Sequence, residues 1–224
     1  MYQTVILDVD GTLVDSNDAH ARAWADTLKE HGHDVDVARI RPLIGMGGDK
    51  LLAKVTGVRP ESPEGQAIAS RRMQIFERRY IDAVRPMPGA RALLERLRDE
   101  RKQLVVASSA QAGELRDLLR IAGALKLIDA IASVDGAGRS KPEPGIVDAA
   151  IAQSGHLPQE IVMIGDTPYD LEAALRAGIG LIALRCGGWT DDQLRGAIAI
   201  YDDPEDLLER FELSPFCRPL PVYP

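Results

Sequence analysis

The first apolar segment of this chain constrains its fold most, because it ends in two closely spaced acids. The run Val5–Leu7 is continuous and apolar, which is typical of a strand buried on both faces. Asp8 and Asp10 follow it, and Gly11 then allows the backbone to bend without steric penalty. Open α/β sheets bind their ligands at the carboxyl ends of their strands. The sequence therefore predicts an α/β fold with a ligand site at these two acids.

Asp8 and Asp10 have two readings when taken by themselves. Two acids at the end of an apolar strand repel each other and lose solvation unless a cation balances them. Mg²⁺ suits such a site, because it prefers oxygen ligands and keeps several of its waters. Asp is also common as a helix cap and in turns, where it needs no metal. The choice depends on whether other polar residues converge on the pair.

Composition and charge narrow the classes of partner and location. The 224 residues carry 27 basic and 34 acidic side chains, a net charge of −7, without a basic stripe, so nucleic acid is not expected. The arginines of 71–72 and 78–79 recur at helical spacing and are expected to form a solvated helix face. No segment approaches the ~20 apolar residues of a membrane span. With two cysteines, Cys186 and Cys217, and no signal-peptide pattern, a cytoplasmic location is expected.

The pattern of apolar residues changes along the chain. Residues 16–84 repeat at helical spacing and contain no strong strand candidate, and a Pro/Gly cluster follows them. Short apolar strands then alternate with helices, which predicts a parallel sheet covered by helices. We therefore expect a Rossmann-like core of residues 1–15 and 85–224 with an inserted all-helical cap domain of residues 16–84. The Pro-rich tail from Ser214 is expected to be extended or loosely docked.

Three further groups of polar residues follow apolar strands or lie on loops that leave them. Ser108 ends one apolar run, where a hydroxyl beside free backbone N–H groups suits a phosphate oxygen, and Ser109 competes for this role. Lys141 is followed by two prolines, Pro142 and Pro144, that restrict the backbone around it. Asp166 and Asp170 follow another apolar strand. Singly, these residues could be a turn serine, a surface lysine and helix-capping acids.

Taken together, the four groups resemble the motifs of the haloacid dehalogenase superfamily. The order matches a DxD motif, a strand-end Ser, a Lys and a GDxxxD motif, and the resemblance covers most of the chain. The helical insertion resembles the C1 cap of subfamily I, which includes phosphoglycolate phosphatases and β-phosphoglucomutases. The resemblance implies a Mg²⁺-dependent phosphatase that acts on a small phosphorylated metabolite.

The resemblance also implies a role for each residue. Asp8 would be the nucleophile, which forms an aspartyl phosphate, and Asp10 the general acid and base. The remaining implied roles are phosphate binding by Ser108, Ser109 and Lys141, Mg²⁺ ligation by Asp8, Asp166 and the Asp10 carbonyl, and support by Asp170 and Thr12. Asp10 also argues against the dehalogenase branch, which does not need a second acid there.

Several alternatives stay open. His20 resembles the entry into the cap of β-phosphoglucomutases, so a sugar phosphomutase is the main alternative to a phosphatase. A phosphonate-cleaving enzyme would need a Schiff-base lysine, for which Lys50 and Lys54 are the nearby candidates. A catalytically silent binding domain on the same scaffold is disfavoured, because no catalytic position is substituted.

The glycine-rich segment 44–52 is either a turn between helices or a loop that approaches a ligand. On the second reading it contributes three glycines to the substrate site: Gly45, Gly47 and Gly48. A mutase needs cap side chains that hold a second phosphate, for which Arg is best shaped. This loop has none, although Arg39, Arg41 and the arginines of 71–72 could supply one. The loop is more similar to that of phosphoglycolate-type phosphatases, with a small anionic ester as the expected substrate.

Overall fold

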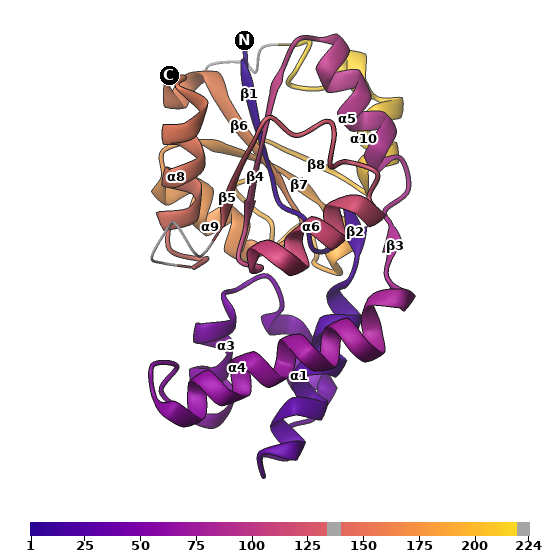
Figure 1. Ribbon diagram of the computed structural model, residues 1–224. Coiled ribbons are helices and arrows are strands. Elements are labelled where there is room, and N and C mark those ends of the chain that lie inside the picture. Colours follow the sequence, from indigo (N-terminus) through magenta and orange to yellow (C-terminus); the bar gives the residue numbers. More distant parts are fainter. Residues whose placement is uncertain (134–139, 219–224) are drawn as a thin grey trace.

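The computed structural model describes residues 1–133 and 140–218, in which a helix-covered parallel sheet stands above a separate group of helices (Figure 1). The sheet has the strand order β5-β4-β1-β6-β7-β8, and all its pairings are parallel. Its strands are β1 (Thr4–Leu7), β4 (Gln103–Ser108), β5 (Ala130–Ser133), β6 (Ile161–Gly165), β7 (Gly180–Leu184) and β8 (Ala199–Tyr201). The predicted α/β fold with a parallel sheet and a helical insert is confirmed.

Strand β1 lies in the middle of the sheet and packs on both of its faces. Val5 and Leu7 belong to one apolar cluster and Ile6 to the other, as the alternation of side chains along a strand requires. The first cluster is covered by α5 (Ala90–Asp99), α6 (Ala112–Ile121) and α10 (Pro204–Glu209), and the second by α8 (Gly145–Ser154) and α9 (Pro168–Arg176). Each fully buried aliphatic side chain contributes roughly 1.5–3 kcal/mol.

The helical insert, residues 17–83, has an apolar core of its own around Trp24 and Leu28. Its helices are α1 (Asn17–Glu30), α2 (Val37–Ile40), α3 (Gly48–Thr56) and α4 (Pro63–Ile75), which continues as the π-helical turn Phe76–Tyr80. Helix α4 begins at the N-cap Ser62, whose Oγ accepts from the Gly65 N–H. The two chain passages between insert and sheet pair as β2 (Val14–Asp15) and β3 (Arg85–Pro86), seen beside α6 in Figure 1.

The prediction of an extended or loosely docked tail was wrong for its first residues. Ser214 is buried, and Phe216 is only 3% exposed and stacks on Phe211 with ring centroids 5.4 Å apart. A single aromatic residue anchors this Pro-rich segment to the first apolar cluster. Across the described parts of the chain, no helix combines the length and apolarity needed to span a bilayer.

Candidate active site

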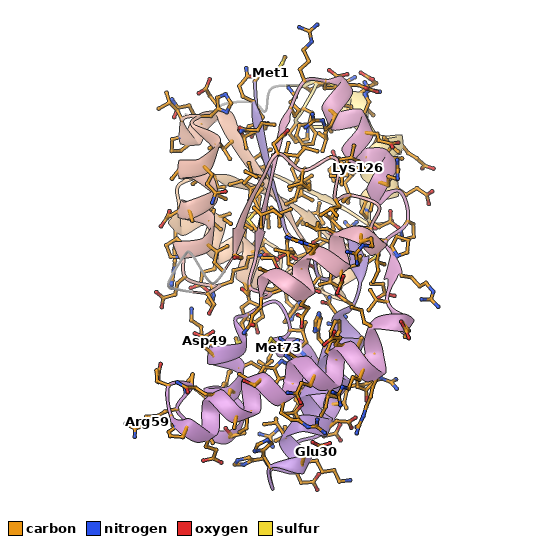
Figure 2. The ribbon with its side chains drawn as sticks, viewed as in Figure 1. Met1, Glu30, Asp49, Arg59, Met73 and Lys126 are labelled. Atoms are coloured by element: carbon orange, nitrogen blue, oxygen red, sulfur yellow. The ribbon has the colours of Figure 1, made fainter. Side chains whose placement is uncertain are left out.

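The predicted site residues meet where three neighbouring strands end. Asp8 directly follows β1, Ser108 ends β4, and Asp166 directly follows β6. The parallel registers of these strands align their carboxyl ends, and the Asp8 N–H donates to the carbonyl of Ile164. A cavity opens here between the sheet and the helical insert. In Figure 2, Asp49 lies on the side of the insert toward the sheet, away from Glu30.

Lys141 is the fixed cation of this site. Its side chain is only 1% exposed, and its Nζ donates to Asp8 Oδ1 and lies 2.7 Å from Asp170 Oδ1. Burial alone would lower the pKa of Lys141, but the charges of Asp170 and Asp8 raise it above its ordinary value. Lys141 therefore stays positively charged and forms a direct ion pair with Asp8.

Three buried carboxylates share this one cation. Ligand oxygens of Asp8, Asp166 and Asp170 all lie within 4.8 Å of one another. Burial raises the pKa of Asp8 well above its ordinary value, although Lys141 opposes the shift. Burial and the Asp170 charge raise the pKa of Asp166 to about 7. This excess of negative charge and the all-oxygen donor set fit a divalent cation of the Mg²⁺ type.

Asp166 is held in place by residues from the first turn after β1. Thr12 Oγ1 donates to its Oδ1 (2.9 Å), and Asn17 Nδ2 donates to its Oδ2 (3.1 Å). Gly11 has a φ of +79°, and a Cβ there would lie 2.2 Å from Asp166 Oδ2. The close approach therefore requires glycine. Asn17 was not predicted as a site residue, and nothing in its local sequence signals its contact with an acid 149 residues away.

Asp170 serves both the helix start and the lysine. Thr167, not Asp166, is the N-cap of α9, and its Oγ1 accepts from the Asp170 N–H. Asp170 Oδ2 in turn accepts from the Thr167 N–H (3.0 Å), which completes a capping box. Its other oxygen, Oδ1, is the one beside Lys141. The same carboxylate thus supports the helix and positions the cation.

The carboxylate of Asp10 is held by the start of the insert. Its Oδ1 accepts from Ser16 Oγ (2.5 Å) and pairs with His20 Nε2 (2.8 Å), and His20 stacks on Phe76. Burial would raise the pKa of Asp10, but the charge and hydrogen bond of His20, with the hydroxyl of Ser16, lower it below its ordinary value. Asp10 is therefore ionised at neutral pH and is oriented by the predicted cap residue His20.

Both candidate serines reach the cavity. Ser108 Oγ accepts from the Ala110 N–H (3.1 Å), and its own hydroxyl hydrogen has no acceptor in the described chain. Ser109 Oγ is buried without a hydrogen-bond partner among the described residues. Two hydroxyl groups with free donors beside Asp8 form a natural site for phosphate oxygens.

Comparison with known proteins agrees with this geometry. The family model described as "Haloacid dehalogenase-like hydrolase" matches residues 5–184, most of the chain. This chain belongs to the haloacid dehalogenase-like hydrolases. A phosphoglycolate phosphatase of Cereibacter sphaeroides is 31% identical over 92% of the chain and 97% of its own length. A fructose-1-phosphate phosphatase of Escherichia coli is 23% identical over 82% and 97%. A hydrolase from Pseudomonas syringae superimposes with a TM-score of 0.85 at 30% identity, over 94% and 98%.

In this haloacid dehalogenase-like hydrolase, the glycine-rich loop of the insert docks on the lysine segment. The Gly47 N–H donates to the carbonyl of Lys141 (3.1 Å), and Ser140 Oγ donates to Asp49 Oδ1 (2.5 Å). Lys50 Nζ donates to the carbonyl of Ser140 (2.6 Å), so this Schiff-base candidate is engaged in a structural bond. The other predicted loop residues line the cavity itself: Gly45 and Gly48.

We predict that Gly47→Ala lowers kcat/KM by about 100-fold, because misplacement of a catalytic group by ~1 Å has effects of that order. A Cβ at position 47 would lie 1.8 Å from Ser140 Oγ and 2.1 Å from Ser140 Cβ, so the loop must move off the lysine segment. Hydrolysis of p-nitrophenyl phosphate measures the change. Gly113→Ala is the control, because a Cβ there meets nothing within 4 Å. Wild-type kcat/KM in Gly47→Ala would show that this docking does not matter for turnover.

Arg72 does not lie on the solvated helix face predicted for it. Arg71 is on the surface, but the side chain of Arg72 is only 14% exposed and lines the cavity. Its Nη1 donates to Glu114 Oε2 (2.8 Å), whose side chain is 8% exposed. The expectation was therefore wrong for Arg72. The signal was present, because Arg72 lies four residues after Ile68 and three before Ile75, on the buried stripe of α4.

Proposed function

We propose that this protein is a Mg²⁺-dependent phosphatase that hydrolyses a phosphate monoester of a small metabolite. The observation that carries the proposal is the setting of Asp8, a buried carboxylate at the end of the central strand, bonded to Lys141 and within 4.8 Å of two further acids. The phosphoglycolate phosphatase relatives support phosphomonoester hydrolysis as the reaction. We also propose a core of residues 1–15 and 85–224 and a cap domain of residues 16–84.

In the first step, Asp8 would attack phosphorus. Its Oδ1 is paired with Lys141, whereas its Oδ2 accepts from no described residue, so we assign the attack to Oδ2. A bond from Oδ2 to phosphorus forms while the ester P–O bond breaks, which leaves an aspartyl phosphate and an alkoxide. Lys141, Ser108 and Ser109 would bind the phosphoryl oxygens during this displacement. When bound, Mg²⁺ supplies positive charge that reduces the repulsion between Asp8 and the phosphate dianion.

Asp10 would move the protons. The approach of a phosphate dianion raises the pKa of a neighbouring carboxylate, so Asp10 can bind a proton and donate it to the departing oxygen. The ionised Asp10 then accepts a proton from the water that hydrolyses the aspartyl phosphate. The hydrogen bonds from Ser16 and His20 hold its carboxylate in one orientation for both transfers. We expect Asp8, Asp166 and the Asp10 carbonyl to hold the metal ion.

A sugar phosphomutase is the second candidate, because Arg72 lies in the cavity where a second phosphate could be held. Both enzymes would share the aspartyl phosphate and differ in whether water or a sugar hydroxyl attacks it. The glycine-rich loop contributes no arginine to the cavity, and Arg72 is already paired with Glu114. These two features favour the phosphatase.

The test is a panel of phosphate esters with and without Mg²⁺. It includes p-nitrophenyl phosphate, 2-phosphoglycolate, fructose 1-phosphate and β-glucose 1-phosphate, with assays for both free phosphate and glucose 6-phosphate. We expect free phosphate from at least one ester, dependent on Mg²⁺. Glucose 6-phosphate formed faster than free phosphate would favour the mutase. Absence of both products from every ester would refute the proposed function.

A further inference from the structure

The cavity beyond Asp8 and Asp10 carries a preformed pair of opposite charges. Among the described residues that line it, Arg72 is the one arginine or lysine, and its charge is balanced by Glu114. We infer that the substrate's leaving group is a neutral polyhydroxylated alcohol, a sugar or polyol, and that Arg72 and Glu114 select it. This inference rests on the proposed phosphatase function and names its substrate class.

The pair joins the two halves of the molecule across the cavity. Arg72 comes from α4 of the insert and Glu114 from α6 of the core, and their side chains are 14% and 8% exposed. An ion pair shielded to this degree is costly to break, because each partner left alone would be a charge with little solvation. A ligand is therefore expected to bind beside the intact pair.

An unpartnered donor indicates what that ligand offers. Arg72 Nε is buried and has no hydrogen-bond partner in the described chain. The Nε–H group can only donate, and a buried donor without a partner is uncommon in folded proteins. Arg72 lines the same cavity as Asp8, so an oxygen atom of the substrate is the natural acceptor.

Glu114 favours a hydroxyl over an anionic group on the substrate's leaving group. An ionised carboxylate only accepts hydrogen bonds, so it needs a donor from the ligand. A hydroxyl group donates to Glu114 and accepts from Arg72 at once. A carboxylate or second phosphate on the leaving group has only acceptors and places a like charge beside Glu114. The arrangement therefore favours hydroxyl groups over a second anion.

The walls of the cavity agree with this assignment. Trp24 lines it, and Arg72 Cζ lies 5.8 Å from the centroid of its ring. Ile44 and Leu51 add apolar surface. Apolar walls with a few placed polar groups suit a carbon skeleton with hydroxyls. The Escherichia coli relative is named for a sugar phosphate and the Cereibacter relative for phosphoglycolate, so relatives alone leave the leaving group open.

The experiment compares kcat/KM for fructose 1-phosphate and erythritol 4-phosphate with that for 2-phosphoglycolate, each relative to p-nitrophenyl phosphate. In the wild type we expect at least one of the two neutral esters to exceed 2-phosphoglycolate by about 10-fold or more. Glu114→Gln keeps the volume of the side chain and removes its charge. We expect it to raise the relative value for 2-phosphoglycolate by about 10-fold and to lower that for the neutral esters by a similar factor.

Two matched controls accompany the variant. Asp117→Asn changes an acid one turn later on α6 that pairs with Arg120 and does not line this cavity. Arg72→Met should remove the discrimination between neutral and anionic esters. Its control is Arg71→Met, because Arg71 is the neighbouring arginine and pairs with a surface acid. Both controls should keep the wild-type ratios.

A wild type that prefers 2-phosphoglycolate to both neutral esters would overturn the inference, whatever the variants do. An unchanged ester ratio in folded Glu114→Gln would also overturn it. The wild-type ratio is decisive by itself, so a variant that fails to fold leaves the test intact. Failure of the proposed phosphatase function would give a different result, because no ester, p-nitrophenyl phosphate included, would then release phosphate.

Discussion

Asp8→Asn is expected to abolish turnover while the protein stays folded. Asparagine keeps the shape of the side chain but removes the charge that attacks phosphorus, so kcat should fall by about 10⁴-fold or more. Lys141 loses one partner but keeps Asp170, so its charge stays paired in the buried site. Phosphate release from p-nitrophenyl phosphate measures kcat, and circular dichroism melting follows the fold.

Intact-protein mass spectrometry adds an independent readout of the nucleophile. The wild type, quenched in acid during turnover, should show a fraction of chains with one added phosphoryl group, and Asp8→Asn should show none. Asp15→Asn is the control, because Asp15 is an exposed acid outside the cavity. If Asp8→Asn retained more than about one tenth of the wild-type kcat, the nucleophile would have to be another residue.

The core of the fold was predictable because its signals are local. The apolar run before Asp8 and the alternation of short strands with helices depend only on neighbouring residues. The meeting of Asp8, Ser108 and Asp166 followed from a general property of parallel sheets, whose strands end at one edge. A strand-end position was therefore enough to bring these residues together without knowledge of their contacts.

Contacts between the insert and the core could not be read in this way. Asp49 and Ser140 are 91 residues apart, and neither has a neighbour that signals the other. Arg72 stands on a buried stripe, which indicates that it is shielded, but not that its partner is Glu114 on another helix. Such pairings are set by how the helical insert packs against the core. We propose that residues at this contact, Arg72 and Glu114, select the substrate.

The buried acids Asp166 and Asp8 make the free energy of unfolding depend on pH and Mg²⁺. Without metal, burial and the Asp170 charge raise the pKa of Asp166 from its ordinary value of 3.8 to about 7, and burial raises that of Asp8 as well. The folded state then binds more protons than the unfolded state between about pH 4 and pH 7. The free energy of unfolding of the metal-free protein should therefore fall as pH rises through this window.

Mg²⁺ should reverse this loss, because it binds the ionised carboxylates. In EDTA, we expect a lower melting temperature at pH 8 than at pH 5. Saturating Mg²⁺, about 100 times its Kd, should then raise the pH 8 melting temperature by roughly 5–10 °C, with a smaller rise at pH 5, where protons compete for Asp8 and Asp166. Asp166→Asn should lose most of the rise, and Asp15→Asn should keep it. Phosphatase activity should disappear in EDTA and return with Mg²⁺. Equal rises at both pH values, or full activity in EDTA, would contradict a magnesium site at these acids.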